Sequence, residues 1–159
     1  MQIRKATLQD IPALKNLYQG TIMNVNSQHY NPAQVSAWAA TGERTTSLEK
    51  KIKEQYFYVA VTANDTITGF ASVEADGELD MMFVHKDFQG QGIATLLIQQ
   101  IYNKAAALGL SSLTAYVSIT AKPFFEKQGF RVVKMQEVQL GEVGLVNYEM
   151  VKELDKAES

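Results

Sequence analysis

The sequence contains no cysteine, and this absence excludes disulfide bonds, thiolate metal ligands and a cysteine nucleophile. It has two histidines, His29 and His85, which are too few for a multi-histidine metal site. Three prolines and ten glycines exclude a collagen-like or proline-rich chain. We therefore expect a folded protein with no bound metal and no covalent intermediate on sulfur.

Long apolar runs and blocks of basic residues are also missing. The apolar stretches fall far short of the ~20 residues that a membrane-spanning helix needs, and no apolar run follows Met1–Lys5 as it does in a signal peptide. The 15 basic and 17 acidic side chains give a net charge of -2, which argues against binding to a nucleic-acid backbone. We expect a cytoplasmic protein with no membrane and no nucleic-acid partner.

The residues that are present indicate one ordinary domain. The 159 residues are 46% hydrophobic and 20% charged, a balance typical of a globular protein. A chain of this length buries about two thirds of its unfolded surface, which is enough for one hydrophobic core. No internal repeat, low-complexity tract or linker interrupts the sequence. We therefore expect a single domain over residues 1–159.

Segments with helical and with strand-like patterns follow one another along the chain. The expected helices run from residue 7 to about 23, from 32 to a stop at 42, over 47–52, from 93 to a stop at 109, and over 120–128. The expected strands cover residues 3–6, 56–61, 67–74, 78–84, 112–117, 130–140 and 143–151. Short turns at 64–65 and 76–77 join three of these strands, so they should form an antiparallel meander. This order predicts an α+β fold.

The stretch from Met82 to Ala94 carries the clearest chemical signal, because a strand ends there, a glycine loop follows and a helix begins. The first amides of a helix lack internal partners and lie at the positive end of the helix dipole. Glycines allow a ligand to approach the backbone closely. The amides of Gln91 to Thr95 could therefore cradle a phosphate, with the Gln89 side chain as a further donor.

Other interpretations of this loop exist. Paired glycines often do no more than form a turn. A P-loop needs lysine after its last glycine, and no lysine follows Gly92. The dinucleotide-binding fingerprint needs a third glycine at the position that Thr95 occupies. The loop alone thus indicates either a turn or an anion site of another kind.

The segment Gln89-Gly90-Gln91-Gly92-Ile93-Ala94 matches the Gln/Arg-x-x-Gly-x-Gly/Ala signature of the GNAT superfamily of acyl-CoA N-acyltransferases. Residues 78–84 resemble the strand before that signature, and residues 121–130 resemble the later family motif Ala-x-x-Phe-Tyr-x-x-x-Gly-Phe. Residues 118–126, with 29–30 and 36–39, are similar to the YafP-like bacterial branch. The resemblance implies three layers: a mixed, mainly antiparallel twisted sheet with one splayed parallel strand pair, and helices on its faces.

The resemblance also implies that acetyl-CoA is the co-substrate and lies where strand 78–84 splays from strand 113–117. The pantetheine arm would pair with the backbone of Met82, Phe83 and Val84. The pyrophosphate would be held by Gln89 and by the amides of Gly90, Gln91, Gly92, Ile93, Ala94 and Thr95. Phe124 and Phe125 would pack beside the thioester. Lys127 would approach the phosphates, or is simply a solvated lysine on a helix.

Two positions depart from the family pattern. Many members carry asparagine where this chain has Ser118, whose hydroxyl can still bond the cofactor arm. Many carry tyrosine, as the acid that protonates the leaving thiolate, where this chain has Phe125. A thiol has a pKa of only ~8.5, so the thiolate can leave without that acid. Tyr116 or Ser118 could replace it.

An amine attacks only when neutral, and an alkylamine with a pKa of ~10.4 needs a base near pH 7. Glu78 and Asp80 are the candidates, and strand alternation places them on one face unless a bulge intervenes. A solvated turn position is the other interpretation of Glu78. A structural hydrogen bond is the other interpretation of Asp80.

The family builds its acceptor site in the region of residues 24–38, so His29, Tyr30 and Trp38 are candidate substrate-binding residues, with Asn147 from the last strand. Core packing would equally explain Trp38, and a loop position would explain His29. The acceptor is expected to be a small-molecule or peptide amine, and a homodimer is possible because family dimers are common. The alternative function is an acyl-CoA-binding sensor that does not react.

Overall fold

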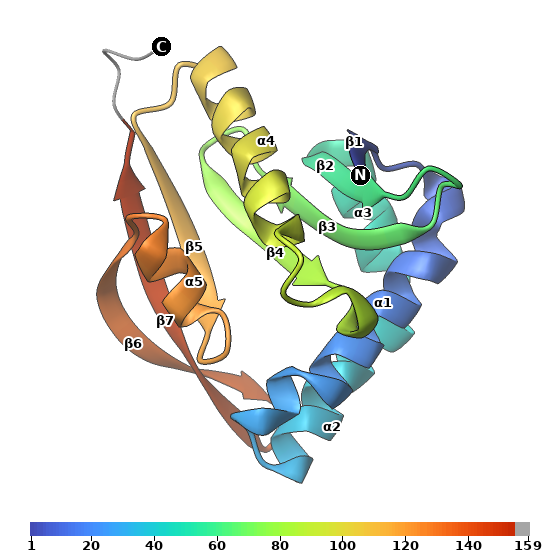
Figure 1. Ribbon diagram of the computed structural model, residues 1–159. Coiled ribbons are helices and arrows are strands. Elements are labelled where there is room, and N and C mark those ends of the chain that lie inside the picture. Colours follow the sequence, from blue (N-terminus) through green and yellow to red (C-terminus); the bar gives the residue numbers. More distant parts are fainter. Residues whose placement is uncertain (155–159) are drawn as a thin grey trace.

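The structure, a computed structural model, describes residues 1–154 of the chain. Residues 155–159, which the expected single domain includes, lie outside the described residues. Seven strands form one sheet in the order β1-β2-β3-β4-β5-β7-β6 (Figure 1). The strands are β1 (Gln2–Lys5), β2 (Tyr56–Val61), β3 (Ile67–Val73), β4 (Glu78–Val84), β5 (Ser112–Ser118), β6 (Arg131–Leu140) and β7 (Val143–Glu153).

Five α-helices and four short 3₁₀ turns connect these strands within the described residues. The helices are α1 (Ile11–Asn24), α2 (Pro32–Ala40), α3 (Thr46–Glu54), α4 (Ile93–Ala107) and α5 (Lys122–Lys127). The turns are η1 (Leu8–Asp10), η2 (Asn26–Gln28), η3 (Thr41–Glu43) and η4 (Lys86–Phe88). Each expected helix and strand is present, and the mixed, mainly antiparallel sheet flanked by helices is confirmed.

Two helices begin later than the sequence predicts. The first starts as the 3₁₀ turn η1, in which Thr7 and Asp10 form a capping box, and becomes α-helical at Ile11. The last starts at Lys122 rather than at residue 120. A proline lies in the first turn of both α-helices, where its missing N–H costs no hydrogen bond.

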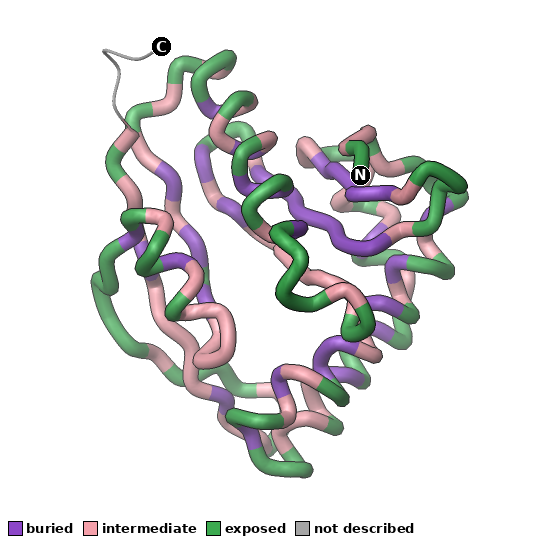
Figure 2. Tube along the Cα trace, viewed as in Figure 1, coloured by how far each residue is buried: buried purple, intermediate pink, exposed green. Residues whose placement is uncertain are grey.

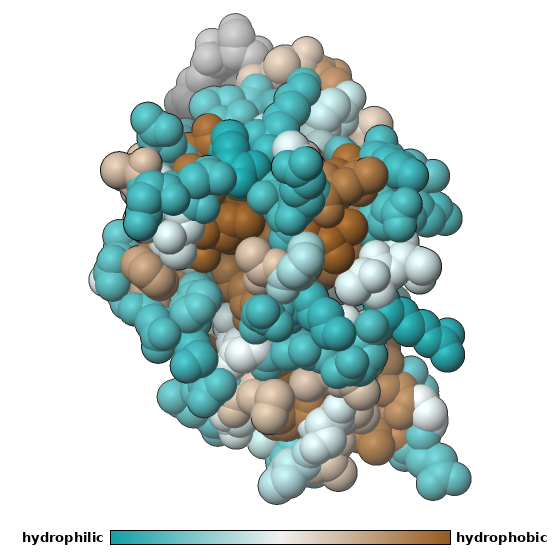
Figure 3. Space-filling view, turned by 90° about the vertical axis from the view of Figure 1, so that its right-hand side faces the viewer, coloured by the Kyte–Doolittle hydropathy of each residue, from teal (hydrophilic) through white to brown (hydrophobic). Residues whose placement is uncertain are grey.

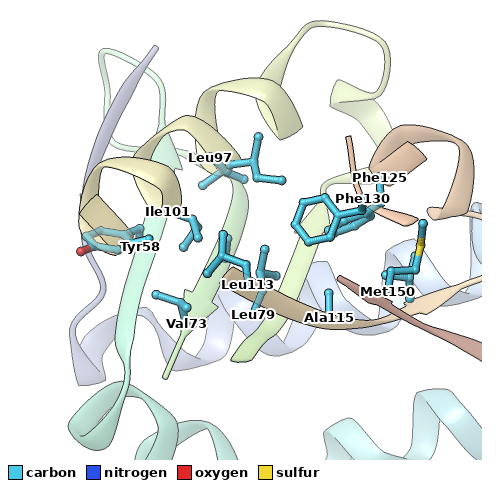
Figure 4. Close-up of a cluster of buried hydrophobic side chains, with 14 of the residues drawn as sticks. Tyr58, Val73, Leu79, Leu97, Ile101, Leu113, Ala115, Phe125, Phe130 and Met150 are labelled. Atoms are coloured by element: carbon cyan, nitrogen blue, oxygen red, sulfur yellow. The ribbon is translucent and has the colours of Figure 1, made fainter. Parts of the chain in front are cut away.

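Strands β1 to β4 form an antiparallel arrangement whose two faces are both covered. The face toward α4 buries Tyr58, Ala71 and Val73, which pack with Leu97 and Ile101 of that helix (Figure 4). The other face packs against α1 and α3 through a second cluster, made of Leu14, Leu17, Leu48, Phe57, Val59, Val61 and Phe70. This part of the sheet therefore has a core on each side.

Strands β5, β7 and β6 are antiparallel to one another and carry α5 on one side. Phe125, Phe130 and Met150 join this part to the cluster under α4. The edge strand β6 is exposed along most of its length (Figure 2), and Met135 on it is 64% exposed. The C-terminal strands thus bury much less than β2 and β3.

The two parts of the sheet meet at β4 and β5, which run parallel and pair only through Glu78 with Thr114 and Leu79 with Ala115. Beyond Leu79 the two strands separate. The expected splayed parallel pair is confirmed.

A β-bulge lies in β4 at this divergence. Ser72 of β3 pairs with Met81 and Val73 pairs with Leu79, so Asp80 is an extra residue without a partner on β3. Asp80 contacts the α3 side, and Met81 packs on the same side against the second cluster. The bulge therefore turns two successive side chains to one face, which strict alternation does not predict.

The outer surface offers few large apolar areas on the side shown in Figure 3, where hydrophilic side chains predominate and hydrophobic ones show between them. Within residues 1–154, no helix combines the length and the apolarity needed to cross a bilayer. In the same part of the chain, no three histidine, aspartate or glutamate side chains gather as a metal site would require.

Candidate functional site

A cavity of about 620 Å³ opens where β4 and β5 separate. Both parts of the sheet line it, together with α1, α2, the start of α4 and the segment that enters α5. Most of the expected site residues are among its lining: Tyr30, Trp38, Asp80, Met82, Phe83, Val84, Gln89, Gly90, Gly92, Ile93, Ala94, Thr95, Tyr116, Ser118, Phe124, Phe125 and Asn147. Residues far apart in the sequence thus converge on one opening.

Four expected site residues do not line this cavity. Glu78 lies at the junction of β4 and β5, and Gln91 is exposed in the glycine loop. Lys127 is exposed on α5. The His29 ring contacts Thr120, with 2.9 Å between Nδ1 and Oγ1, so it ties two loops together.

The glycine loop has the backbone conformation that only glycine adopts easily. Gly90 and Gly92 have φ angles of 72° and 79°, in the left-handed region. A Cβ atom built on either residue would meet no other atom within 4 Å. The space above both glycines is therefore open to a ligand, and a side chain at either position would fill it.

Among the described residues, the amides of Gly92 to Thr95 donate to no backbone or side-chain acceptor. The first amide after them, that of Leu96, donates to the Gly92 carbonyl at 3.1 Å and so begins the helical ladder. Gly92 is the N-cap of the 15-residue helix α4 and provides no side-chain cap. The loop therefore presents a row of unpaired donors at the positive end of a long helix, a typical anion site.

The edge of β4 that faces the opening is unpaired beyond Leu79 within the described residues. On its other side, the His85 amide donates to the Thr68 carbonyl at 2.8 Å. Because antiparallel pairs alternate between bonded and non-bonded, the amides of Met82 and Val84 point toward the open edge. A ligand arm can pair there as an added strand would.

The Val84 carbonyl marks the inner end of that edge. It accepts hydrogen bonds from Thr21 Oγ1 at 2.9 Å and from Gln89 Nε2 at 2.7 Å. The Gln89 side chain, expected to donate to a phosphate, is thus used to hold the end of β4 in this structure.

Ser118 lies at the end of β5, opposite β4. Its Oγ accepts the Ala121 amide at 3.1 Å and lies 3.4 Å from Asn26 Nδ2. The hydroxyl therefore fixes the turn that leads into α5. Phe125 follows in α5, is buried, and packs edge-to-face on Phe124 at 5.6 Å between ring centroids.

Tyr116 of β5 reaches the cavity with a 46% exposed side chain. Desolvation raises the pKa of Tyr116, and the negative charges of Glu149 and Glu78 raise it further. The phenol therefore keeps its proton at neutral pH. Burial also raises the pKa of Glu78, with added repulsion from Glu74, Asp80 and Asp76.

The bulge residue Asp80 lines the cavity and has two partners. Lys51 Nζ lies 2.8 Å from Asp80 Oδ2, and Gln55 Nε2 donates to the same oxygen at 2.9 Å. Asp80 Oδ1 has no hydrogen-bond partner among the described residues. Buried polar atoms lie nearby in the fold: Gln55 Oε1 and Ser72 Oγ, the latter on β3 beside the bulge, are without partners.

Four aromatic rings form one wall of the cavity. Phe83 lies 4.9 Å from Tyr18 and 6.5 Å from Trp38, and Trp38 lies 5.4 Å from Tyr30, all in edge-to-face arrangements. We call Tyr18, Tyr30, Trp38 and Phe83 the aromatic wall. Trp38 is therefore both a packing residue and a cavity residue.

Tyr30 also connects the two parts of the sheet. Its hydroxyl accepts the Ile119 amide at 2.9 Å and donates to the Val146 carbonyl at 2.8 Å. Gln34 of α2 donates to the Gly144 carbonyl at 2.9 Å. The segment from η2 to α2 thus ties β5 and β7 to the N-terminal part, below the opening in Figure 1.

Sequence reasoning missed Tyr18, Thr41 and Lys51, which also line the cavity. A weak signal for Lys51 exists, because it follows the apolar Leu48 by three residues and precedes Ile52, which places it at the border of the buried face of α3. No local pattern signals Tyr18 or Thr41, because their position depends on how α1 and α2 pack.

Comparison with known families gives a match over residues 26–154 to the acetyltransferase (GNAT) domain. The chain belongs to the GNAT family. It is therefore an acyltransferase, and the expected family is confirmed.

Among curated GNAT relatives, the chain is 34% identical over 150 residues to the uncharacterized N-acetyltransferase YafP of Escherichia coli (strain K12), covering 94% of each protein. The resemblance to the YafP-like branch is thereby confirmed. A shorter match, 31% identical over 87 residues, links 55% of the chain to 58% of the peptidyl-lysine N-acetyltransferase YjaB of Salmonella typhimurium.

A solved GNAT structure supports the fold. A GCN5-related N-acetyltransferase from Rhodopseudomonas palustris has a TM-score of 0.91 and 27% identity, covering 96% of this chain and 95% of its own. The PaiA N-acetyltransferase of Thermoplasma acidophilum, solved in complex with coenzyme A, has a TM-score of 0.78 and 18% identity, covering 96% and 98%. At that identity the second likeness concerns the fold alone.

Proposed function

We propose that this protein transfers the acetyl group of acetyl-CoA to the nitrogen of a primary amine, by direct attack while both substrates are bound. The observation that supports it most is the row of unpaired amides from Gly92 to Thr95, at the mouth of the opening between β4 and β5. Related folds solved with coenzyme A or acetyl-CoA make the same ligand the natural occupant here.

The residues present fit the pyrophosphate, the pantetheine arm and the thioester of acetyl-CoA. The amides of residues 90–95 would hold its pyrophosphate, and the open space over the two glycines leaves room for it. The amide of Val84 would pair with the pantetheine arm along the free edge of β4. Acetyl-CoA would supply the reactive thioester, beside which the Phe124 side chain would pack.

Asp80 is the proposed base, because it lines the cavity whereas Glu78 does not. Its free Oδ1 would accept the proton that the attacking amine must lose. The Met82 amide, the open-edge amide nearer Asp80, would polarise the carbonyl of the thioester, which leaves the Val84 amide to the pantetheine arm. Tyr116, which holds its proton at neutral pH, is the proposed donor to the leaving thiolate, with Ser118 as the second candidate.

A specific observation favours a second function, the binding of acyl-CoA without transfer. Phe125 occupies the position of the family's tyrosine, and a phenylalanine ring cannot give a proton to a thiolate. A protein of this kind would sense acyl-CoA rather than consume it.

The acyl-CoA site is tested by calorimetric titration with coenzyme A of wild type, Gly92→Glu and Gly109→Glu. Gly92→Glu should weaken binding by about a hundredfold or more, because like charges placed together at a binding site cost several kcal/mol. Gly109, at the other end of α4, has a φ angle of 70° and equal open space, so it controls for backbone strain and added charge. Equal affinities for both variants would contradict the assignment.

Transfer is separated from sensing by release of free coenzyme A across a panel of amines. The enzyme should release it with at least one amine, and Asp80→Asn should lower kcat by about 10²-fold or more. Tight binding of acetyl-CoA with no release for any amine would support the sensor instead.

A further inference from the structure

The acceptor side of the cavity contains one pair of opposite charges. Among the described residues that line the cavity, Lys51 and Asp80 are the only ones with charged side chains, and they form an ion pair with 2.8 Å between Nζ and Oδ2. Their side chains are 28% and 21% exposed, so water screens them only in part. The pair gives the cavity no net charge.

The two oxygens of Asp80 differ in what they can still bind. Lys51 and Gln55 both occupy Oδ2, while Oδ1 has no partner within the described residues. Oδ1 can therefore take one ammonium or one N–H of an incoming amine. No second carboxylate lines the described cavity, so the Lys51–Asp80 pair together with one bound ammonium carries a net positive charge.

The aromatic wall itself offers few free polar groups to an acceptor. The Tyr18 hydroxyl lies 2.7 Å from Thr41 Oγ1, which donates in turn to the Trp38 carbonyl. The Tyr30 hydroxyl already makes two bonds to the backbone. With these polar groups satisfied, the wall offers ring surface, which suits an apolar or aromatic body and a single cation.

We propose that Lys51 determines acceptor specificity, selecting amines with one positive charge on an apolar or aromatic body and rejecting those with a second cationic group. This inference rests on the proposed function and adds the class of substrate. A second ammonium would enter a cavity of low polarity whose remaining charge is the Lys51 ammonium. The repulsion between these two ammonium groups would weaken the binding of such an amine.

The test compares kcat/KM for 2-phenylethylamine and for 1,4-diaminobutane at saturating acetyl-CoA. Wild type should prefer 2-phenylethylamine by about tenfold or more, and Lys51→Gln should lower that preference by roughly tenfold, because it removes the repelling charge. Lys51→Arg keeps the charge and should keep the preference. Lys53→Gln, which removes an exposed lysine of the same helix paired with Glu49, is the matched control and should change nothing.

A wild type that uses 1,4-diaminobutane as well as 2-phenylethylamine would overturn the inference while leaving the proposed function intact. An unchanged ratio in Lys51→Gln, with a melting temperature close to wild type, would overturn it too. If no amine releases coenzyme A, the proposed function fails. In that case the affinities of the two amines for the protein saturated with coenzyme A are measured by calorimetry. The ratio of these affinities, in wild type and in the Lys51 variants, then decides the inference.

Discussion

The two parts of the sheet differ in how they are covered. Strands β2 and β3 have helices on both faces and bury nearly all their side chains, whereas β5, β7 and β6 are packed on one face and β6 is largely exposed. The face of β5 and β7 opposite α5 carries Tyr116 and Asn147 into the cavity. The part of the sheet with β2 and β3 therefore supplies stability, and the part with β5, β7 and β6 supplies a wall for the site.

The site lies at the weakest connection between these parts. Only two residue pairs join β4 to β5, and the Tyr30 and Gln34 hydrogen bonds join the parts again beyond the opening. A closed sheet would have paired the edge of β4 and the facing edge of β5, and no ligand arm could then bind there.

The two parts should differ most in how much the free energy of unfolding falls when a side chain is truncated to alanine. Phe70 of β3 is fully buried and lies 5.6 Å from Phe57 and 5.5 Å from Phe83. Phe70→Ala should lower the free energy of unfolding by about 3–5 kcal/mol, through lost burial and a cavity. Met135→Ala on exposed β6 should change it by no more than about 0.5 kcal/mol. Urea denaturation measures both, and similar losses would contradict the comparison.

The N-terminal part should also be the acid-sensitive one. Asp10 is 9% exposed, and hydrogen bonds from Arg4 at 2.8 and 2.9 Å are the first cause of its lowered pKa. A lowered pKa means that this stability is complete above the unfolded value of ~3.9 and is lost as the pH falls through the lower folded pKa.

Asp10→Asn should therefore cost about 1.5–3 kcal/mol at pH 7 and flatten the decline in stability below pH 4. Glu142→Gln, at an exposed carboxylate with no ion pair among the described residues, is the control and should leave the curve unchanged. Urea titrations at pH 7, 5, 4 and 3 provide the measurement, and an unaltered acid limb in Asp10→Asn would disprove this role.

Removing a single oxygen atom, that of the Tyr30 hydroxyl, should weaken the connection between the two parts of the sheet. Tyr30→Phe removes the hydroxyl that bonds Ile119 and Val146, and should cost about 1–3 kcal/mol, because a partly buried amide and a partly buried carbonyl lose their partner. Tyr116→Phe removes an exposed hydroxyl, and should stay within about 0.5 kcal/mol. Thermal melting of both variants checks this, and equal shifts would argue against a connecting role for Tyr30.

The smallest change in stability should come from Glu78, at the junction of β4 and β5, and its replacement should stabilise the protein. Burial and neighbouring acids raise the pKa of Glu78, so its charge opposes folding above the unfolded pKa. Glu78→Gln should stabilise the protein at pH 7 by about 0.5 kcal/mol, and the gain should vanish on acidification. Denaturation at pH 7 and pH 4 measures it, and a loss at pH 7 would point to a structural need for the carboxylate.

The sequence predicts those features that depend on neighbours along the chain. Turns, alternation in β4 and the Gly90–Gly92 spacing locate the strands and the loop, because each reflects local backbone geometry. The bulge at Asp80 is not visible in the sequence, since it depends on pairing with β3. The Lys51 contact is likewise invisible, because it needs α3 packed against β4.

The remaining differences between the expected and the observed site come from the hydrogen-bond partners that its side chains find in the fold. Gln89 was expected to face a phosphate but donates to Val84 here, since an amide side chain binds whichever acceptor the fold brings near. His29 contacts Thr120, which itself lines the cavity, and Lys127 is exposed on α5, so the roles expected for these two residues stay predictions.

The hydrogen-bond donors of the glycine loop are main-chain amides, so most substitutions in the loop leave them in place. Apart from the two glycines, residues 89–95 can drift to other amino acids, proline excepted, without deleting a single N–H. The proposed acceptor preference depends instead on a side chain, that of Lys51, which a single codon change can replace. A lineage built this way can diversify its targets rapidly while keeping the same acyl donor.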